Sequence, residues 1–252
     1  MSDREVAVVV GASGAFGTVI VDRLVAAELD VIAVARTEAA LGDLAATHPG
    51  RVEACAADLT DDAAQAVLAE AVGERTVRMV VHGPGVAVAG GIADAPVEAL
   101  IDAVDIKVGG LLRLVRATVD RMVEHSRIVA IAGHYGLEPS PYAASAGIAN
   151  AAVFSAVRQL SMVYGERGIT AHTLAPGPAD TERLRRVAAD RAERDGVTVD
   201  EVLDDMRAES SIRALSTPEQ VAWAVAMLLA PEASAMTGST VMLESGRRKG
   251  LP

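Results

Sequence analysis

Seven apolar runs of strand length recur along this chain of 252 residues, and most are separated by segments with helical periodicity. The runs span Val6–Val10, Val31–Ala35, Val52–Ala56, Val77–Val81, Ile128–Ala132, Ile169–Leu174 and Val241–Leu243. Because these runs are continuously apolar rather than alternating, both faces of the sheet should be covered by helices. We therefore expect an α/β fold with a doubly wound, mainly parallel seven-stranded sheet, built as a single domain over residues 1–252.

The intervening segments are rich in alanine and carry helix-start signals. Helices are expected to begin near Thr37, Thr60, Pro96, Pro141 and Thr217. Residues 181–214 differ, because they are densely charged and have a turn at Gly196. This segment is expected to form a helical substrate lid, and a solvated helical pair on the rim of the sheet is an equally open interpretation.

Charge and cysteine content restrict the partners. Asp and Glu outnumber Lys and Arg by 34 to 23, which gives a formal net charge of −11 and argues against nucleic acid. The apolar runs are too short to span a membrane. A single cysteine, Cys55, and the absence of a signal-peptide pattern at the start favour a reducing, cytoplasmic location. No metal site is predicted.

A glycine-rich loop follows the first strand. Its residues are Gly11, Ala12, Ser13, Gly14, Ala15, Phe16 and Gly17, at the point where the first helix should begin. Backbone N–H groups and the helix dipole can hold a pyrophosphate there, although such loops also occur as simple tight connections. Arg36 ends the second strand, where an acidic residue would favour NAD and a basic one the 2′-phosphate of NADP. NADP(H) is therefore the expected cofactor.

These features, in this order, resemble the short-chain dehydrogenase/reductase family over nearly the whole chain. Val10–Gly17 is similar to the family's T-G-x-x-x-G-x-G loop, Asp58-Leu59 to its adenine-contacting pair, and Pro176–Thr181 to P-G-x-x-x-T, whose threonine meets the nicotinamide amide. The resemblance implies a Rossmann-like fold. It also implies a set of cofactor-binding residues: Gly11, Ser13, Gly14, Ala15, Phe16, Gly17, Arg36, Asp58, Leu59, Gly83, Pro84, Gly85, Tyr142, Pro176, Gly177 and Thr181.

The departures from the family pattern lie at its chemical centre. His82-Gly83-Pro84-Gly85 stands for N-N-A-G, and Tyr142–Ala146 is similar to Y-x-x-S-K with Ala146 at the lysine position. Ala132-Gly133-His134 stands where the family presents its serine. In the segment similar to D-V-N-x-x-G, Lys107 replaces the asparagine. The resemblance therefore implies a tyrosine without its usual serine and lysine.

Three residues are the candidate catalytic groups. Tyr142 would donate a proton to a carbonyl oxygen, and without the family's lysine its protonated form favours reduction over oxidation. Lys107 could restore positive charge in the space beside Ala146, and His134 could donate a hydrogen bond to a substrate oxygen. The alternatives are that Lys107 extends to solvent or an acidic neighbour and that His134 caps a loop.

The expected function is an NADP(H)-dependent oxidoreductase that reduces a carbonyl of a small organic molecule to an alcohol. Two alternatives stay open: a catalytically inactive cofactor-binding subunit that pairs with an active paralogue, and a non-redox enzyme that uses the same pocket. The resemblance also implies a homo-oligomer, a dimer or tetramer, formed through helices over about residues 96–124 and 141–167.

Overall fold

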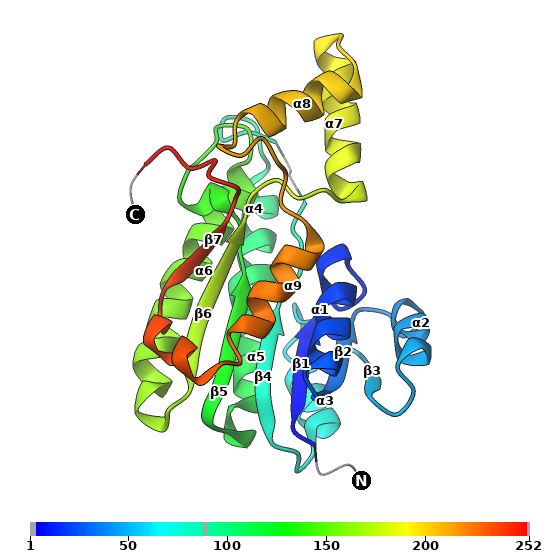
Figure 1. The fold of residues 1–252 in the computed structure, drawn as a ribbon, viewed down its shortest axis with the longest axis vertical. Helices are drawn as coiled ribbons and strands as arrows, with labels where there is room; N and C mark the ends of the chain where they lie inside the picture. Colours follow the sequence, from blue (N-terminus) through cyan, green and yellow to red (C-terminus); the bar gives the residue numbers. More distant parts are fainter. Residues whose placement is uncertain (1–3, 88–89, 251–252) are drawn as a thin grey trace.

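Seven parallel strands form one sheet in the computed structural model, which describes residues 4–87 and 90–250 (Figure 1). The strands are β1 (Val6–Val10), β2 (Asp30–Ala35), β3 (Val52–Ala56), β4 (Val77–His82), β5 (Met122–Ile131), β6 (Thr170–Pro176) and β7 (Thr240–Leu243). Their order is β3-β2-β1-β4-β5-β6-β7, and every pairing is parallel. The chain is a single Rossmann-like domain, as the sequence predicts.

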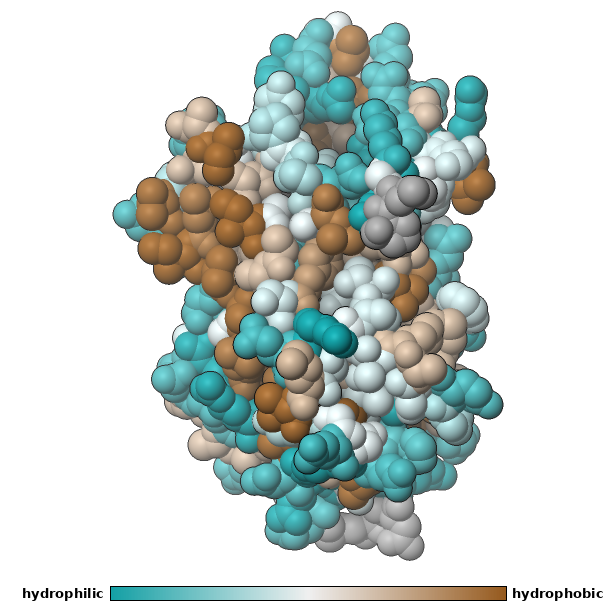
Figure 2. All heavy atoms as spheres, turned by 90° about the vertical axis from the view of Figure 1, so that its left-hand side faces the viewer, coloured by the Kyte–Doolittle hydropathy of each residue, from teal (hydrophilic) through white to brown (hydrophobic). Residues whose placement is uncertain are grey.

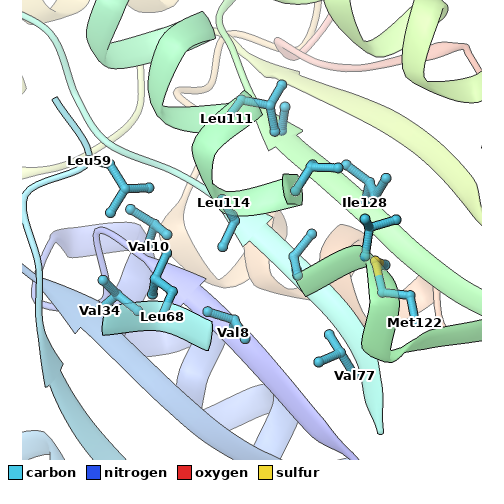
Figure 3. Close-up of a cluster of buried hydrophobic side chains, with 14 of the residues drawn as sticks. Val8, Val10, Val34, Leu59, Leu68, Val77, Leu111, Leu114, Met122 and Ile128 are labelled. Atoms are coloured by element: carbon cyan, nitrogen blue, oxygen red, sulfur yellow. The ribbon is translucent and has the colours of Figure 1, made fainter. Parts of the chain in front are cut away.

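Helices cover both faces of the sheet, so each strand buries side chains in two directions. In β1, Val6, Val8 and Val10 point into one core, while Ala7 and Val9 point into the other. Figure 3 shows the first core, in which Val8 and Val10 lie near Leu68 and Leu114 from the covering helices. This two-sided burial explains why the strands are continuously apolar in sequence.

The first core is covered by α3 (Ala64–Val72), α5 (Gly110–Thr118) and α6 (Ala144–Tyr164). The second is covered by α1 (Ala15–Ala26), α2 (Ala39–Thr47) and α9 (Pro218–Met227). Thr217 caps α9 as predicted, with a capping box in which its side chain accepts from the Gln220 backbone N–H. None of the described helices is both long and apolar enough to cross a membrane.

Three elements differ from the sequence expectation, and one of them is β5, which begins at Met122 rather than at Ile128. The segment after Pro96 consists of α4 (Val97–Val104), a π-helical turn at Asp105–Gly109, α5 and a 3-10 turn at Val119–Arg121, after which β5 begins. Helix α6 begins at Ala144 rather than at Pro141, so Tyr142 precedes its first turn. The π turn contains Lys107, and such turns often occur at functional sites.

The charged segment forms α7 (Glu182–Asp195) and α8 (Val199–Ala208), which meet at Gly196 in the left-handed conformation. Ala188, Ala192, Val202 and Leu203 give this pair a small core of its own. In Figure 1 the pair lies beyond the carboxyl ends of the strands. The strand order reverses between β1 and β4, so a crevice is expected at this same edge of the sheet.

Candidate active site

A cavity of about 670 Å³ opens at the carboxyl ends of the strands, beneath α7. It brings together most of the residues that the sequence singled out as functional. Those that line it are Gly11, Ser13, Gly14, Ala15, Phe16, Gly17, Gly83, Pro84, Gly85, Lys107, His134, Pro176, Gly177 and Thr181. They come from five separate stretches of the chain, so the fold rather than local sequence assembles this site.

The glycine loop can approach a ligand closely because side chains would not fit in it. Gly11 has a φ of +81°, a conformation that side-chain-bearing residues rarely adopt. A Cβ on Gly17 would lie 2.1 Å from the Gly11 carbonyl oxygen, and one on Gly11 would lie 3.1 Å from that of Gly83. Gly14 is the N-cap of α1 and has no side chain to occupy the helix N-terminus. This arrangement fits a pyrophosphate bound at the start of a helix.

Four predicted cofactor residues lie outside the cavity: Arg36, Asp58, Leu59 and Tyr142. Arg36 is exposed just after β2, and its guanidinium is close enough to Asp58 to act on that carboxylate. Hydrogen bonds from Thr60 hold the pKa of Asp58 below its usual value, with a smaller contribution from Arg36. Leu59 is buried in the first core. Arg36 and Asp58 are therefore together, at the outer end of β2 and β3, where they can meet the adenosine end of an extended dinucleotide.

Lys107 is the buried cation of the site. Its side chain reaches inward from the π turn, is 5% exposed, and donates from Nζ to the Ile131 carbonyl oxygen at 2.8 Å. Burial, and to a smaller extent the positive charge of Arg183, lower its pKa to about 8. An ammonium with this pKa remains mostly protonated at pH 7 but can release a proton. It does not extend to solvent.

His134 lies at the end of β5, in a short 3-10 turn over His134–Gly136, and is 6% exposed. Burial lowers its pKa to about 4, and Arg247 acts in the same direction. A hydrogen bond to the Pro176 carbonyl opposes the shift. The buried Nε2 atom has no hydrogen-bond partner among the described residues. The ring is therefore neutral near pH 7.

The structure does not bring Tyr142 into the cavity. Its side chain is 77% exposed in the turn before α6, and it is not among the lining residues. The expected catalytic and cofactor roles of Tyr142 therefore lack the required geometry in this arrangement. The physical reason is the helix start: the two α6 positions that line the cavity one turn apart are Ala146 and Asn150.

Asn150 is a site residue that the sequence analysis missed. It is 6% exposed, lines the cavity, and has an Oδ1 atom without a hydrogen-bond partner in the described chain. A Cβ on Gly133 at the adjacent end of β5 would lie 2.9 Å from Asn150 Nδ2. A serine at position 133 would therefore crowd this amide. Asn150 lies one helical turn after Ala146 on α6, so both face the cavity.

The lining is cationic although the chain as a whole is acidic. Five of its charged residues are basic (Lys107, Arg183, Arg186, Arg191 and Arg247) and one is acidic (Glu182). Arg183 donates to the Val86 carbonyl across the cavity mouth, and Arg247 pairs with Glu209. The sequence showed the arginines of the 181–214 segment only as a charged run, because nothing local indicates which of them face inward.

Comparisons with known proteins agree with this architecture. A family model described as Enoyl-(Acyl carrier protein) reductase matches residues 11–247. The short-chain reductase protein NovJ of Streptomyces niveus is 28% identical, over 98% of this chain and 95% of that protein. Galactitol 2-dehydrogenase of Rhizobium johnstonii is 29% identical, over 97% and 95%.

Among solved structures, L-sorbose reductase of Gluconobacter frateurii, complexed with NADPH and L-sorbose, superposes with a TM-score of 0.89 at 21% identity and covers 98% of each chain. At that identity the match concerns the fold alone. The matched family model, the relatives and the shared sheet lead to one conclusion. The protein belongs to the short-chain dehydrogenase/reductase family of oxidoreductases.

Proposed function

We propose that this protein is an NADP(H)-dependent reductase that converts a carbonyl of a small organic molecule into an alcohol, with Lys107 as the proton donor. The observation that carries the proposal is the buried ammonium of Lys107 in the same cavity as the glycine loop. Among the polar groups of that cavity, Lys107 combines burial with a pKa near the working range of general acids.

The residues present fit a dinucleotide. The loop over Gly11–Gly17 would hold the pyrophosphate, since its glycines leave backbone N–H groups exposed at the start of α1. Arg36 would meet the 2′-phosphate, and Asp58 lies beside it. Pro176, Gly177 and Thr181 line the cavity near the Lys107 end and would contact the nicotinamide half. When bound, NADPH supplies the hydride.

Lys107 performs the acid step in this proposal. Its Nζ uses one hydrogen for the Ile131 carbonyl, which orients the ammonium and leaves two hydrogens for a substrate oxygen. Nζ would transfer a proton to the oxygen of the carbonyl that is reduced, and the neutral amine would then regain a proton from solvent. The charge of Arg183 favours this release because it disfavours a second cation nearby. Tyr142 has no part in the proposal.

Coenzyme binding gives the first test of this function. We expect the wild-type protein to quench or shift NADPH fluorescence on titration and to bind NADPH more tightly than NADH. The variant Arg36→Gln should lose about tenfold or more in NADPH affinity and little in NADH affinity, because only NADPH has the 2′-phosphate. Arg23→Gln, a surface change in the last turn of α1, is the matched control. Absence of binding by either coenzyme would refute the proposal.

Measuring whether the protein turns over carbonyl substrates distinguishes the proposed reductase from a non-catalytic partner subunit. A carbonyl panel assayed by NADPH oxidation should yield substrates for the wild type. Tight NADPH binding without turnover of any carbonyl would instead favour the non-catalytic, partner-subunit function, which the absence of the family's serine and lysine, with Gly133-His134 and Ala146 in their places, would then explain.

We also propose a homo-oligomer and a cytoplasmic location. Exposed apolar side chains on α4 and α6, which pack together, include Val97, Ile101, Ile148, Met162 and Val163. Figure 2, which views the molecule from the α6 side, shows apolar residues gathered on part of this face, as expected for a surface between copies of the chain.

The buried, unpaired Cys55, whose pKa is raised by burial and by Glu53, supports the proposed reducing, cytoplasmic location.

A further inference from the structure

The backbone next to Lys107 is held by a second buried side chain, that of His82. His82 is the last residue of β4, is 1% exposed, and its Nε2 atom lies 3.0 Å from the carbonyl oxygen of Ile106 in the π turn. A carbonyl oxygen only accepts, so Nε2 carries the proton and donates this hydrogen bond. The Ile106 carbonyl and the Lys107 N–H belong to one planar peptide unit, so the bond fixes the plane from which the Lys107 side chain begins.

The sheet holds Lys107 at two points. A Cβ on Gly110, which follows the π turn at the start of α5, would lie 2.9 Å from His82 Cε1, so the ring packs closely against the end of the turn. His82 is paired in register with Ala130 on β5. The residue after Ala130 is Ile131, whose carbonyl accepts from Lys107 Nζ. Two neighbouring strands therefore fix Lys107, β4 at its backbone and β5 at its ammonium.

His82 performs this task without a charge of its own. Burial, and to a smaller extent the charge of Lys107, lower the pKa of His82 to about 3, so the ring is neutral throughout the range in which Lys107 titrates. Its Nδ1 atom is buried and has no hydrogen-bond partner among the described residues. The side chain is not part of the cavity lining. What the ring offers the site is therefore one directed hydrogen bond, made from behind the cavity.

We propose that His82 is a positioning residue for Lys107: its hydrogen bond to the Ile106 carbonyl holds the π turn so that the ammonium stays inside the cavity. The effect on rate rests on the proposed reductase function, whereas the effect on the position of Lys107 does not. In the sequence, His82 stands at the start of the segment similar to N-N-A-G, where a side chain in the wall of the cofactor pocket was expected. Small displacements of a proton donor are costly, which gives such a bond its value.

The pKa of Lys107 gives a test that needs no turnover. The chain has two lysines, Lys107 and the exposed Lys249, so protein isotopically labelled at lysine Cε gives two side-chain NMR signals, which Lys107→Met assigns. The pKa of Lys107 should be about 8 in the wild type and should move towards 10.5 in His82→Leu, because a side chain no longer held inside gains contact with water. Arg183, the charged group that lowers this pKa, is the same in both proteins. Since His82 is neutral, the shift reports displacement rather than a lost charge.

Rescue by a conservative variant distinguishes the hydrogen bond from mere packing. His82→Gln should keep the pKa of Lys107 near the wild-type value, because the glutamine amide can donate from the place of Nε2. His82→Asn is one bond shorter and should behave like His82→Leu. In carbonyl reduction, His82→Leu and His82→Asn should lower kcat by about tenfold or more, with KM and NADPH affinity changed less than about twofold.

His172→Leu is the matched control. His172 is also buried in the sheet, on β6, where its Nε2 bonds to the Thr170 hydroxyl and its Nδ1 has no partner among the described residues. It does not line the cavity. Its replacement should cost similar stability in denaturant unfolding and leave both the pKa of Lys107 and kcat at their wild-type values.

A folded His82→Leu protein whose Lys107 keeps a pKa of about 8 would overturn the inference, as would a His82→Gln protein that behaves like His82→Leu. If the wild type reduces no carbonyl, the reductase proposal fails, while the lysine titrations still decide the positioning role. If His82→Leu and His82→Asn do not fold, NMR of the histidine ring nitrogens in the wild type decides it. A proton on Nε2 of His82 supports the inference, and a proton on Nδ1 instead would refute it.

Discussion

Lys107 occupies a position that is unfavourable for a charged group. Moving its pKa from 10.5 to about 8 corresponds to about 3 kcal/mol of preference for the neutral form in the folded chain. Because the folded pKa is the lower one, this cost is fully present below pH 8. It disappears as the pH rises from 8 to 10.5, where the unfolded chain still binds the proton and the folded chain does not. A residue kept at such a cost suits a functional rather than a structural role.

The variant Lys107→Met tests whether this charge costs stability and is needed for activity. Methionine fills similar space without charge, so we expect NADPH-dependent reduction to fall by about 100-fold or more while the free energy of unfolding at pH 7 stays the same or rises. Urea unfolding followed by circular dichroism, alongside the kinetic assay, checks both halves. If the variant unfolded more easily by more than about 1 kcal/mol and kept its rate, Lys107 would be a structural residue.

Which residues of α6 face the cavity could not be predicted from the sequence. Spacing alone gave Tyr142 and Ala146 as the family's tyrosine and lysine positions, but spacing does not say which turn of an alanine-rich helix faces the cavity. That choice depends on the start of α6 at Ala144 and on its packing against the end of β5. Lys107 and His134 could be found because each lies at a position defined by a strand end or a distinctive motif. Asn150 has no local signal of this kind.

At the scale of elements, the strands were predictable because both cores demand continuous apolar runs. The six strands other than β5 agree with the sequence prediction to within about two residues at each end. β5 begins at Met122, six residues before the predicted Ile128. The prediction missed this first half because it includes exposed polar residues, which are not typical of a buried strand. The π turn at Asp105–Gly109 was not predictable either, because it depends on how α4 and α5 pack rather than on composition.

The link between β1 and α1 is the element on which coenzyme binding depends most. A Gly17→Ala change would force a Cβ to within 2.1 Å of the Gly11 carbonyl oxygen, so the loop must shift. We expect a loss of about 1–3 kcal/mol in the free energy of unfolding and at least about tenfold in NADPH affinity. Denaturant unfolding and NADPH fluorescence titration measure these two losses.

Gly42→Ala in α2 is the matched control for this change, because a Cβ there meets nothing within 4 Å. It should stabilise the protein by up to about 1 kcal/mol, since alanine favours a helix interior, and leave NADPH affinity unchanged. If the two glycine variants had the same free energy of unfolding and the same NADPH affinity, the close contact between position 17 and the Gly11 carbonyl would not be what requires a glycine there.

For the whole molecule, the fold places basic residues around the cavity although the chain as a whole is acidic. A net charge of −11 coexists with a cavity lined by five basic residues and one acidic residue. The acidic surface and the basic cavity together suit a small anionic coenzyme rather than a polyanion such as nucleic acid. Sequence composition alone predicted the exclusion of nucleic acid, but the concentration of positive charge in the cavity depends on the fold.

The most direct test of the account is the pH dependence of NADPH-dependent carbonyl reduction under single-turnover conditions. If the ammonium of Lys107 donates the proton, the rate should be level below pH 8 and should fall about tenfold per pH unit above it, because the reactive form is lost through a pKa of about 8. The residual rate of Lys107→Met should not share this fall. A wild-type rate that stays level from pH 7 to 10 would contradict Lys107 as the acid.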